Sequence, residues 1–151
     1  MYLLDTNHCS GILESDVAIV QKVTEVGTEA LAIAFATAGE LRYMSANSDR
    51  PAENRIRVDI LIGDIGLYYV DDQTIDEYAH LKAAIVKHFG PREKPRRRTA
   101  STRALGFDDN DIWIAAVALR HNLIVVSSDS DFTRMREVSP LAVESWWSPS
   151  R

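Results

Sequence analysis

Short apolar segments alternate with longer amphipathic ones along this chain. Five of the short segments are rich in apolar and β-branched residues and are too short for helices, which is typical of buried β-strands. These predicted strands are residues 2–5, 31–36, 66–70, 123–132 with a polar end, and 141–146.

Apolar residues at helical spacing predict a helix in each of five longer segments. These are residues 17–26, 37–46, 52–64, 74–89 and 111–122. Ser15 or Asp16 can cap the first of these helices. Thr37 can cap the second, since Glu40 follows at the capping-box position. Strands that alternate with helices indicate an α/β fold, with a parallel sheet flanked by α-helices on both faces.

The size of the chain fits one domain. Its 151 residues, 46% of them hydrophobic, can bury a core, so we expect a single domain over residues 1–151. Cys9 is the only cysteine and cannot form an intramolecular disulfide, which favours the cytoplasm. No leader segment is recognised and no apolar run approaches the roughly 20 residues of a membrane-spanning helix, so no membrane association is expected.

Charge is unevenly distributed along the chain. The formal net charge is −5, yet residues 91–106 form a basic loop that we expect to be mobile. Six basic residues in it surround a single acid, Glu93; they are Arg92, Lys94, Arg96, Arg97, Arg98 and Arg103. The protein is therefore predicted to be an acidic body that carries one basic segment.

Four acidic residues share one predicted edge of the sheet. Asp5 and Asp129 each end a strand, Glu40 follows the second strand, and Asp111 begins a helix. Ligands of parallel sheets bind at this edge. Crowded carboxylates raise each other's pKa unless cations neutralise them, and Mg²⁺ or Mn²⁺ prefers oxygen ligands. The four histidines lack the spacing of a zinc site, so packing or surface roles are predicted for them. Phosphodiester hydrolysis assisted by a metal is the chemistry that these acids favour.

The stretch "FDDNDIWIAA", residues 107–116, holds three of the acids of the chain. Asp108 is the predicted helix cap, because Asp111 follows three residues later at the position that completes a capping box. Asp109 and Asn110 are expected to be solvated. The apolar residues after them predict a helix anchored in the core.

Five short sequence blocks occur in a specific order along the chain. They are "YLLDTN" (2–7), "GEL" (39–41), "DIWIAAVAL" (111–119), "VSSDSDF" (126–132) and "LAVESWW" (141–147). Together they resemble the PIN-domain ribonucleases, and within these the VapC-type toxins of type II toxin–antitoxin systems. Each block is weak singly, but the ordered set is specific and spans the chain.

The resemblance implies a Mg²⁺- or Mn²⁺-dependent endoribonuclease with a single PIN-like domain. In it the four acids are both catalytic and metal-binding; they are Asp5, Glu40, Asp111 and Asp129. Asp131 is a second candidate at the same end of the site. Thr6, Asn7 and Ser127 match small polar positions that line such sites, and capping the local backbone is the alternative role for them. The resemblance also implies a homodimer and a cognate VapB-like antitoxin that inhibits the enzyme.

The basic loop departs from this pattern, since it is longer and more basic than the connection expected in short VapC-like proteins. If it lies beside the acidic cleft, Arg96, Arg97 and Arg98 would hold phosphates of the RNA substrate. A solvated loop without RNA contacts is the alternative.

Two other functions remain open. A phosphatase of the haloacid dehalogenase type also places an aspartate after its first strand, but it requires a second aspartate where this chain has Asn7. A non-catalytic nucleic-acid-binding PIN-like module would use the basic loop alone, and it leaves the acids at the strand ends unexplained.

Overall fold

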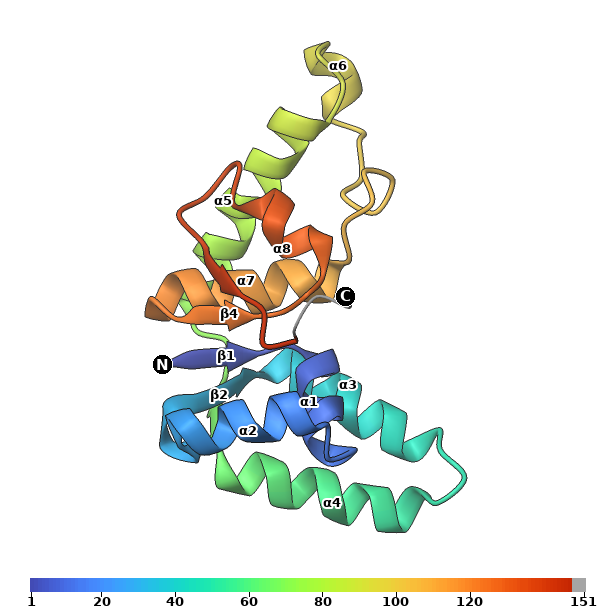
Figure 1. The fold of residues 1–151 in the computed structure, drawn as a ribbon. Coiled ribbons are helices and arrows are strands. Elements are labelled where there is room, and N and C mark those ends of the chain that lie inside the picture. The colour runs from blue at the N-terminus through green and yellow to red at the C-terminus, as the bar shows by residue number, and fades with distance from the viewer. Residues whose placement is uncertain (148–151) are drawn as a thin grey trace.

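A five-stranded parallel sheet forms the centre of the computed structural model, which describes residues 1–147. Its strands lie in the order β3-β2-β1-β4-β5. They are β1 (Tyr2–Leu4), β2 (Leu31–Ala34), β3 (Gly66–Tyr68), β4 (Ile124–Val126) and β5 (Ala142–Glu144). Because every pair of neighbours is parallel, the carboxyl ends of all five strands meet at one edge of the sheet (Figure 1).

Eight α-helices and one short 3₁₀ helix surround the sheet in the described part of the chain. They are α1 (Thr6–Leu13), α2 (Val17–Val26), η1 (Thr28–Ala30), α3 (Phe35–Ala46), α4 (Pro51–Asp64), α5 (Asp72–Phe89), α6 (Lys94–Arg97), α7 (Asp109–His121) and α8 (Ser130–Met135). Figure 1 shows α5, α7 and α8 on one side of the sheet and α1, α2 and α4 on the other. The predicted α/β fold with helices on both faces is confirmed. None of the helices over residues 1–147 is long and apolar enough to span a membrane.

Two hydrophobic clusters, one on each side of the sheet, form the core. Side chains alternate along the strands, so that Leu3 packs in the cluster with α5, α7 and α8 while Leu4 packs in the cluster with α1, α2 and α4. Ala32 and Ile33 divide in the same way. Both faces of the sheet are therefore buried, which explains why the strands are continuous apolar runs.

The predicted elements differ from the structure mainly at their ends. The strand predicted over residues 31–36 stops at Ala34, because Phe35 already begins α3. The polar end of the strand predicted over 123–132 belongs instead to α8, and no helix was predicted over Thr6–Leu13. Both missed helices are short and follow an aspartate that caps them, Asp5 for α1 and Asp129 for α8. Their stability comes from the cap and from packing rather than from helix-forming residues.

Two of the three predicted helix caps are present in the structure, and one is not. Asp16 caps α2 and accepts the backbone N–H of Ile19, as predicted. Thr37 does not cap α3, because the helix starts two residues earlier, at Phe35. Thr37 is therefore a residue within the helix, and its side chain is buried. Asp108 caps α7 as predicted, by accepting the N–H of Asn110.

The basic loop over residues 91–106 contains the short helix α6 at the end of an arm formed by α5 (Figure 1). The chain then returns to the body of the protein, where Arg134 fixes it. The Arg134 guanidinium donates to the carbonyl oxygens of Leu105 and Gly106, at 2.9 and 3.2 Å, and lies 3.8 Å from the ring centre of Phe107. Gly106 has a φ of +82°, a conformation that favours glycine at this return.

Candidate active site

A pocket of about 330 Å³ opens at the carboxyl edge of the sheet. The elements that end or begin at this edge bring all four predicted acids to its wall. The lining residues are Asp5, Thr6, Asn7, Glu40, Tyr43, Met44, Asp108, Asp111 and Asp129. Residues distant in sequence thus form one acidic cavity, as the strand-end positions predicted.

Asp5 is the most deeply placed of these acids. It follows β1 directly, is only 4% exposed, and caps α1 by accepting the backbone N–H of His8 at 2.7 Å. Its other carboxylate oxygen accepts a hydrogen bond of 2.5 Å from the hydroxyl of Ser127, the residue that follows β4. A buried carboxylate needs such donors, because desolvation penalises the charged form. Ser127 therefore contributes by holding Asp5 in place.

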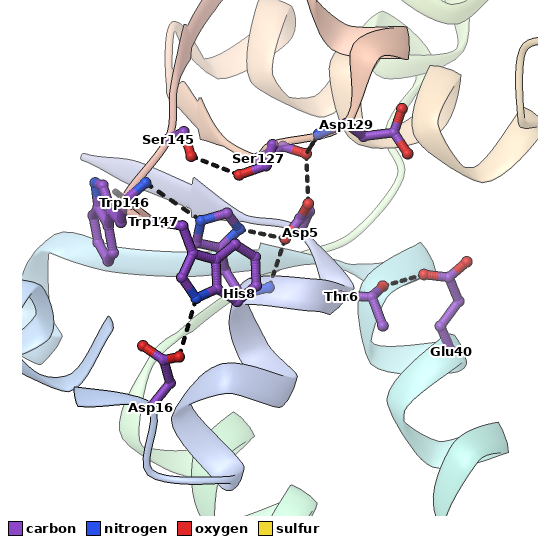
Figure 2. A network of polar contacts seen from close by, with 11 residues as sticks. Asp5, Thr6, His8, Asp16, Glu40, Ser127, Asp129, Ser145, Trp146 and Trp147 are labelled. Atoms are coloured by element: carbon purple, nitrogen blue, oxygen red, sulfur yellow. Dashed lines mark hydrogen bonds and ion pairs between the residues drawn. The ribbon is translucent and has the colours of Figure 1, made fainter. Parts of the chain in front are cut away.

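His8 bonds to the Asp5 carboxylate and does not itself line the pocket (Figure 2). Its imidazole is fully buried, and Nδ1 lies 2.8 Å from the Asp5 carboxylate. The opposite nitrogen, Nε2, accepts the backbone N–H of Trp146 at 3.4 Å, which places the ring proton on Nδ1. The Trp147 ring packs on the imidazole with centres 4.3 Å apart, and its indole N–H donates to Asp16. A packing role was predicted for the histidines, and the polar contact of His8 with Asp5 was missed.

Glu40 forms the opposite wall of the pocket. One carboxylate oxygen accepts the Thr6 hydroxyl from the first turn of α1, as Figure 2 shows. The other accepts the Asn110 side-chain amide of α7 at 2.8 Å. Asn110 is exposed, as expected, and its side chain also joins α3 to α7 across the site.

Asp111 has no such partners. None of the hydrogen bonds found over residues 1–147 uses its carboxylate, although the residue is half-buried. Burial raises the pKa of Asp111 to about 8, and the neighbouring carboxylates add to the shift. The acids that contribute to the shift are Asp129, Asp108, Asp131 and Glu40. A cation in the pocket would relieve this repulsion.

The capping box predicted for Asp108 and Asp111 does not form in full. In such a box the later acid accepts the backbone N–H of the cap residue. Here the Asp108 N–H donates to Asp131 at 3.0 Å, from a different element. The Asp111 carboxylate is left for the pocket because Asp131 takes its place.

Asp129 and Asp131 complete the acidic cluster at the start of α8. Carboxylate oxygens of Asp111, Asp129 and Asp131 lie within 4.8 Å of one another, a spacing that would suit a metal ion. Asp129 is exposed, and its side chain also accepts the Asp131 N–H at 2.8 Å. Burial raises the pKa of Asp131, whereas the N–H donated by Asp108 opposes the shift. Asp131 was ranked below Asp129 from sequence, yet it belongs to this cluster.

The remaining predicted residues divide into two groups. Thr6 and Asn7 line the pocket beside Asp5. Arg96, Arg97 and Arg98 do not line it, because they lie at α6, on the arm. Asp109 is exposed, as expected, and it also accepts the Lys82 ammonium and the Tyr78 hydroxyl, both at 2.7 Å.

A parallel α/β sheet with a cluster of carboxylates at its carboxyl edge defines a domain with a site suited to a hard divalent cation. Residues 2–138 match the family model of the PIN domain, and the chain belongs to this family. A search of curated protein sequences gives no match.

Solved structures of similar fold belong to toxin–antitoxin complexes. VapBC from Salmonella typhimurium, bound to DNA, has a TM-score of 0.77 and 22% identity over 97% of this chain and 98% of that chain. VapBC-1 from nontypeable Haemophilus influenzae has a TM-score of 0.74 and 20% identity over 96% and 97%. VapBC2 from Rickettsia felis, bound to a promoter DNA fragment, has a TM-score of 0.71 and 20% identity over 96% and 98%. At these identities the likeness concerns the fold.

Proposed function

We propose that this chain is a metal-dependent endoribonuclease of the VapC toxin type, which hydrolyses RNA phosphodiester bonds with Mg²⁺ or Mn²⁺. The observation that supports this most is the half-buried Asp111, whose carboxylate faces four other acids without a hydrogen-bond donor. An arrangement that is unfavourable when empty of cations is typical of a metal site. Membership of the PIN family supports the nuclease assignment.

Asp5, Glu40, Asp111 and Asp129 are the proposed ligands, directly or through water, with Asp131 beside them. A bound divalent cation would lower the pKa of a water molecule and stabilise the charge that develops on the phosphate. The hydrogen bonds from His8 and Ser127 hold the Asp5 carboxylate in one orientation.

Helix N-termini also favour a phosphate at this site. α1 begins after Asp5 and α7 begins after Asp108, and both residues line the pocket. The positive ends of the two helix dipoles reduce the repulsion between the acids and an incoming phosphate.

An antitoxin is the proposed partner of the chain. The structures of similar fold contain VapBC complexes, so a VapB-like antitoxin is the expected inhibitor. We also propose a homodimer and a cytoplasmic location, which follow from the VapC-type assignment and from the single cysteine.

RNA cleavage tests the proposal directly. Purified protein is incubated with unstructured and structured RNA plus Mg²⁺, Mn²⁺ or a chelator, beside Asp5→Asn, Asp129→Asn and the exposed control Asp64→Asn. We expect cleavage that needs the metal, that both site variants lose and that the control keeps. Asp129 is exposed, so its variant is the better test if replacement of buried Asp5 impairs folding.

Three results would contradict the proposal. Equal cleavage by all variants would assign the activity to a contaminant or to another site. Hydrolysis of a phosphate monoester without RNA cleavage would favour the phosphatase alternative, and RNA binding without any hydrolysis would favour the non-catalytic module.

A further inference from the structure

A second concave surface lies between α5 and the segment that holds α6. This groove has a volume of about 610 Å³. Its floor is aliphatic, since Ala79, Ala83 and Val86 recur at helical spacing along one face of α5. Small side chains on the floor leave space for a ligand.

The rim of this groove is positively charged. Five cationic residues line it, and no acid lines it; they are Lys82, Lys87, Lys94, Arg97 and Arg98. Lys82 pairs with Asp109 at 2.7 Å, but no ion pair within the described residues involves the other four. Arg96 lies outside the groove and pairs with Glu93 at 3.5 Å. Only two of the three arginines predicted to bind RNA therefore face this surface.

The groove continues toward the acidic pocket through side chains that are in contact. Lys82 and Tyr78 line the groove, and both bond to Asp109 at the start of α7. Asp109 in turn lines a neighbouring hollow of about 670 Å³ with Arg103 and Asp129. Asp129 also lines the acidic pocket, so the three concave surfaces follow one another along this side of the protein.

We propose that the groove between α5 and α6 binds a single-stranded segment of RNA that extends from the acidic pocket. This inference rests on the proposed nuclease function. Cations on both rims match the phosphates of a strand, while the aliphatic floor matches exposed bases or riboses, which a duplex would hide. The proposed binding does not include base stacking on Tyr78. The Tyr78 ring is already stacked on Trp113, with ring centres 3.7 Å apart, and the Lys82 ammonium lies 5.0 Å from its centre. Phosphate contacts therefore dominate, and the binding tolerates many sequences.

Binding of a labelled 20-nucleotide unstructured RNA, measured by fluorescence anisotropy in chelator, tests the groove without cleavage. The variant replaces Lys87, Arg97 and Arg98 with Ala. Its matched control loses the same charge elsewhere, at Arg50, Arg55 and Arg136. We expect the groove variant to lose about tenfold or more in affinity and about 2 from the log–log salt slope, since each phosphate contact on a single strand contributes roughly 0.7.

A single-residue comparison and a short substrate sharpen the test. Arg97→Ala should weaken binding more than Arg96→Ala, although the two residues are adjacent. With Mn²⁺ present, the triple groove variant should cleave the long RNA with a raised KM and an unchanged kcat. A tetranucleotide offers the groove few phosphates, so its cleavage by this variant should differ less from that by the unaltered protein.

The groove and the nuclease can fail separately. Groove-dependent binding without metal-dependent cleavage would reject the proposed function and keep the groove. Cleavage with equal salt slopes for groove variant and control would reject the groove alone. An equal loss of affinity for duplex RNA, or groove-dependent binding of an acidic polypeptide without any effect on RNA, would also overturn the inference.

Discussion

The acidic pocket and the basic groove hold their charges in opposite ways. The carboxylates of the pocket lie after β1, within α3 and at the starts of α7 and α8, and most of them are fixed by hydrogen bonds. The cations of the groove lie on an arm that extends from the body, and most have no ion-pair partner among the described residues (Figure 1). Chemistry requires fixed geometry, whereas binding of a flexible strand gains from adaptable side chains.

The contrast also separates two kinds of cost. In the pocket, like charges are forced together in a half-buried space, and Asp111 carries the largest penalty because no donor offsets it. In the groove, long side chains remain in solvent, where repulsion is screened by salt. Removing a charge should therefore stabilise the metal-free protein at the pocket and change little at the groove.

The largest effect is expected for Asp111→Asn. In chelator at pH 7 the variant should have a Tm higher by about 2 °C or more. An acid whose pKa is raised by folding must either take up a proton or hold its charge beside the other acids, and Asn avoids both costs. Addition of Mn²⁺ should raise the Tm of the unaltered protein but not that of the variant. RNA cleavage should fall by more than the roughly 10–100-fold typical of residues behind metal ligands. Calorimetric unfolding with and without Mn²⁺ measures both Tm changes, the increase caused by the substitution and the increase caused by the metal.

Asp109→Asn is the matched control for this change. Asp109 lies two residues away on the same turn of α7, but it accepts Lys82 and Tyr78 instead of facing the acids. The Asp109→Asn substitution should lower the Tm slightly, and Mn²⁺ should still raise the Tm of this variant. If both variants respond alike, the repulsion is a property of the helix start and the distinction between Asp111 and its neighbours is wrong.

A smaller effect is expected for His8, a positioning residue behind Asp5. His8→Phe keeps an aromatic ring of similar size but removes the donor to Asp5, so Mn²⁺ affinity should fall roughly 10–100-fold. His8→Asn keeps a donor near the position of Nδ1 and should recover part of that affinity. Titration of Mn²⁺ followed by electron paramagnetic resonance measures both variants.

A purely structural histidine would behave differently. His8→Phe would then lower the Tm in the presence and absence of metal by equal amounts and leave Mn²⁺ affinity unchanged, and His8→Asn would recover nothing. Such a result would limit the fixed geometry of the pocket to Ser127 and the start of α1.

The sequence predicted the positions of the acids better than their surroundings. Asp5, Asp111 and Glu40 could be placed at one edge because apolar strand runs fix where each strand ends. The partners of these acids could not be predicted, since His8 acts on Asp5 only after α1 forms, and Asp131 takes the Asp108 N–H from 23 residues away. The first contact is local but depends on a helix that was not predicted, whereas the second depends on tertiary packing.

The same limit applies to the basic loop. Its charge was evident, but which cations share a surface depends on how α6 folds back beside α5. Arg96 and Arg97 are adjacent in sequence, yet only Arg97 lines the groove. A count of charges could not separate them.

The smallest effect on the metal site is expected for a change in the helix that carries the arm. Asp71 caps α5 by accepting the backbone N–H and the hydroxyl of Thr74, both at 2.7 Å. Asp71→Ala should lower the Tm by about 2–4 °C, as expected for one helix cap in a domain of this size, and leave Mn²⁺ binding at the pocket unchanged. The exposed Asp76→Ala on the same helix is the control and should change the Tm less.

The pH dependence of this cap tests its mechanism. The hydrogen bonds from Thr74, with a smaller contribution from Arg120, lower the pKa of Asp71 from 3.8 to about 2. Because the pKa in the folded state lies below that in the unfolded state, the contribution to stability is complete above pH 4 and is lost as the pH falls toward 2. The difference in Tm between the unaltered protein and Asp71→Ala should therefore narrow between pH 4 and 2. A constant difference would mean that Asp71 stabilises the arm through packing, and its charge would then play no part in the contrast with the pocket.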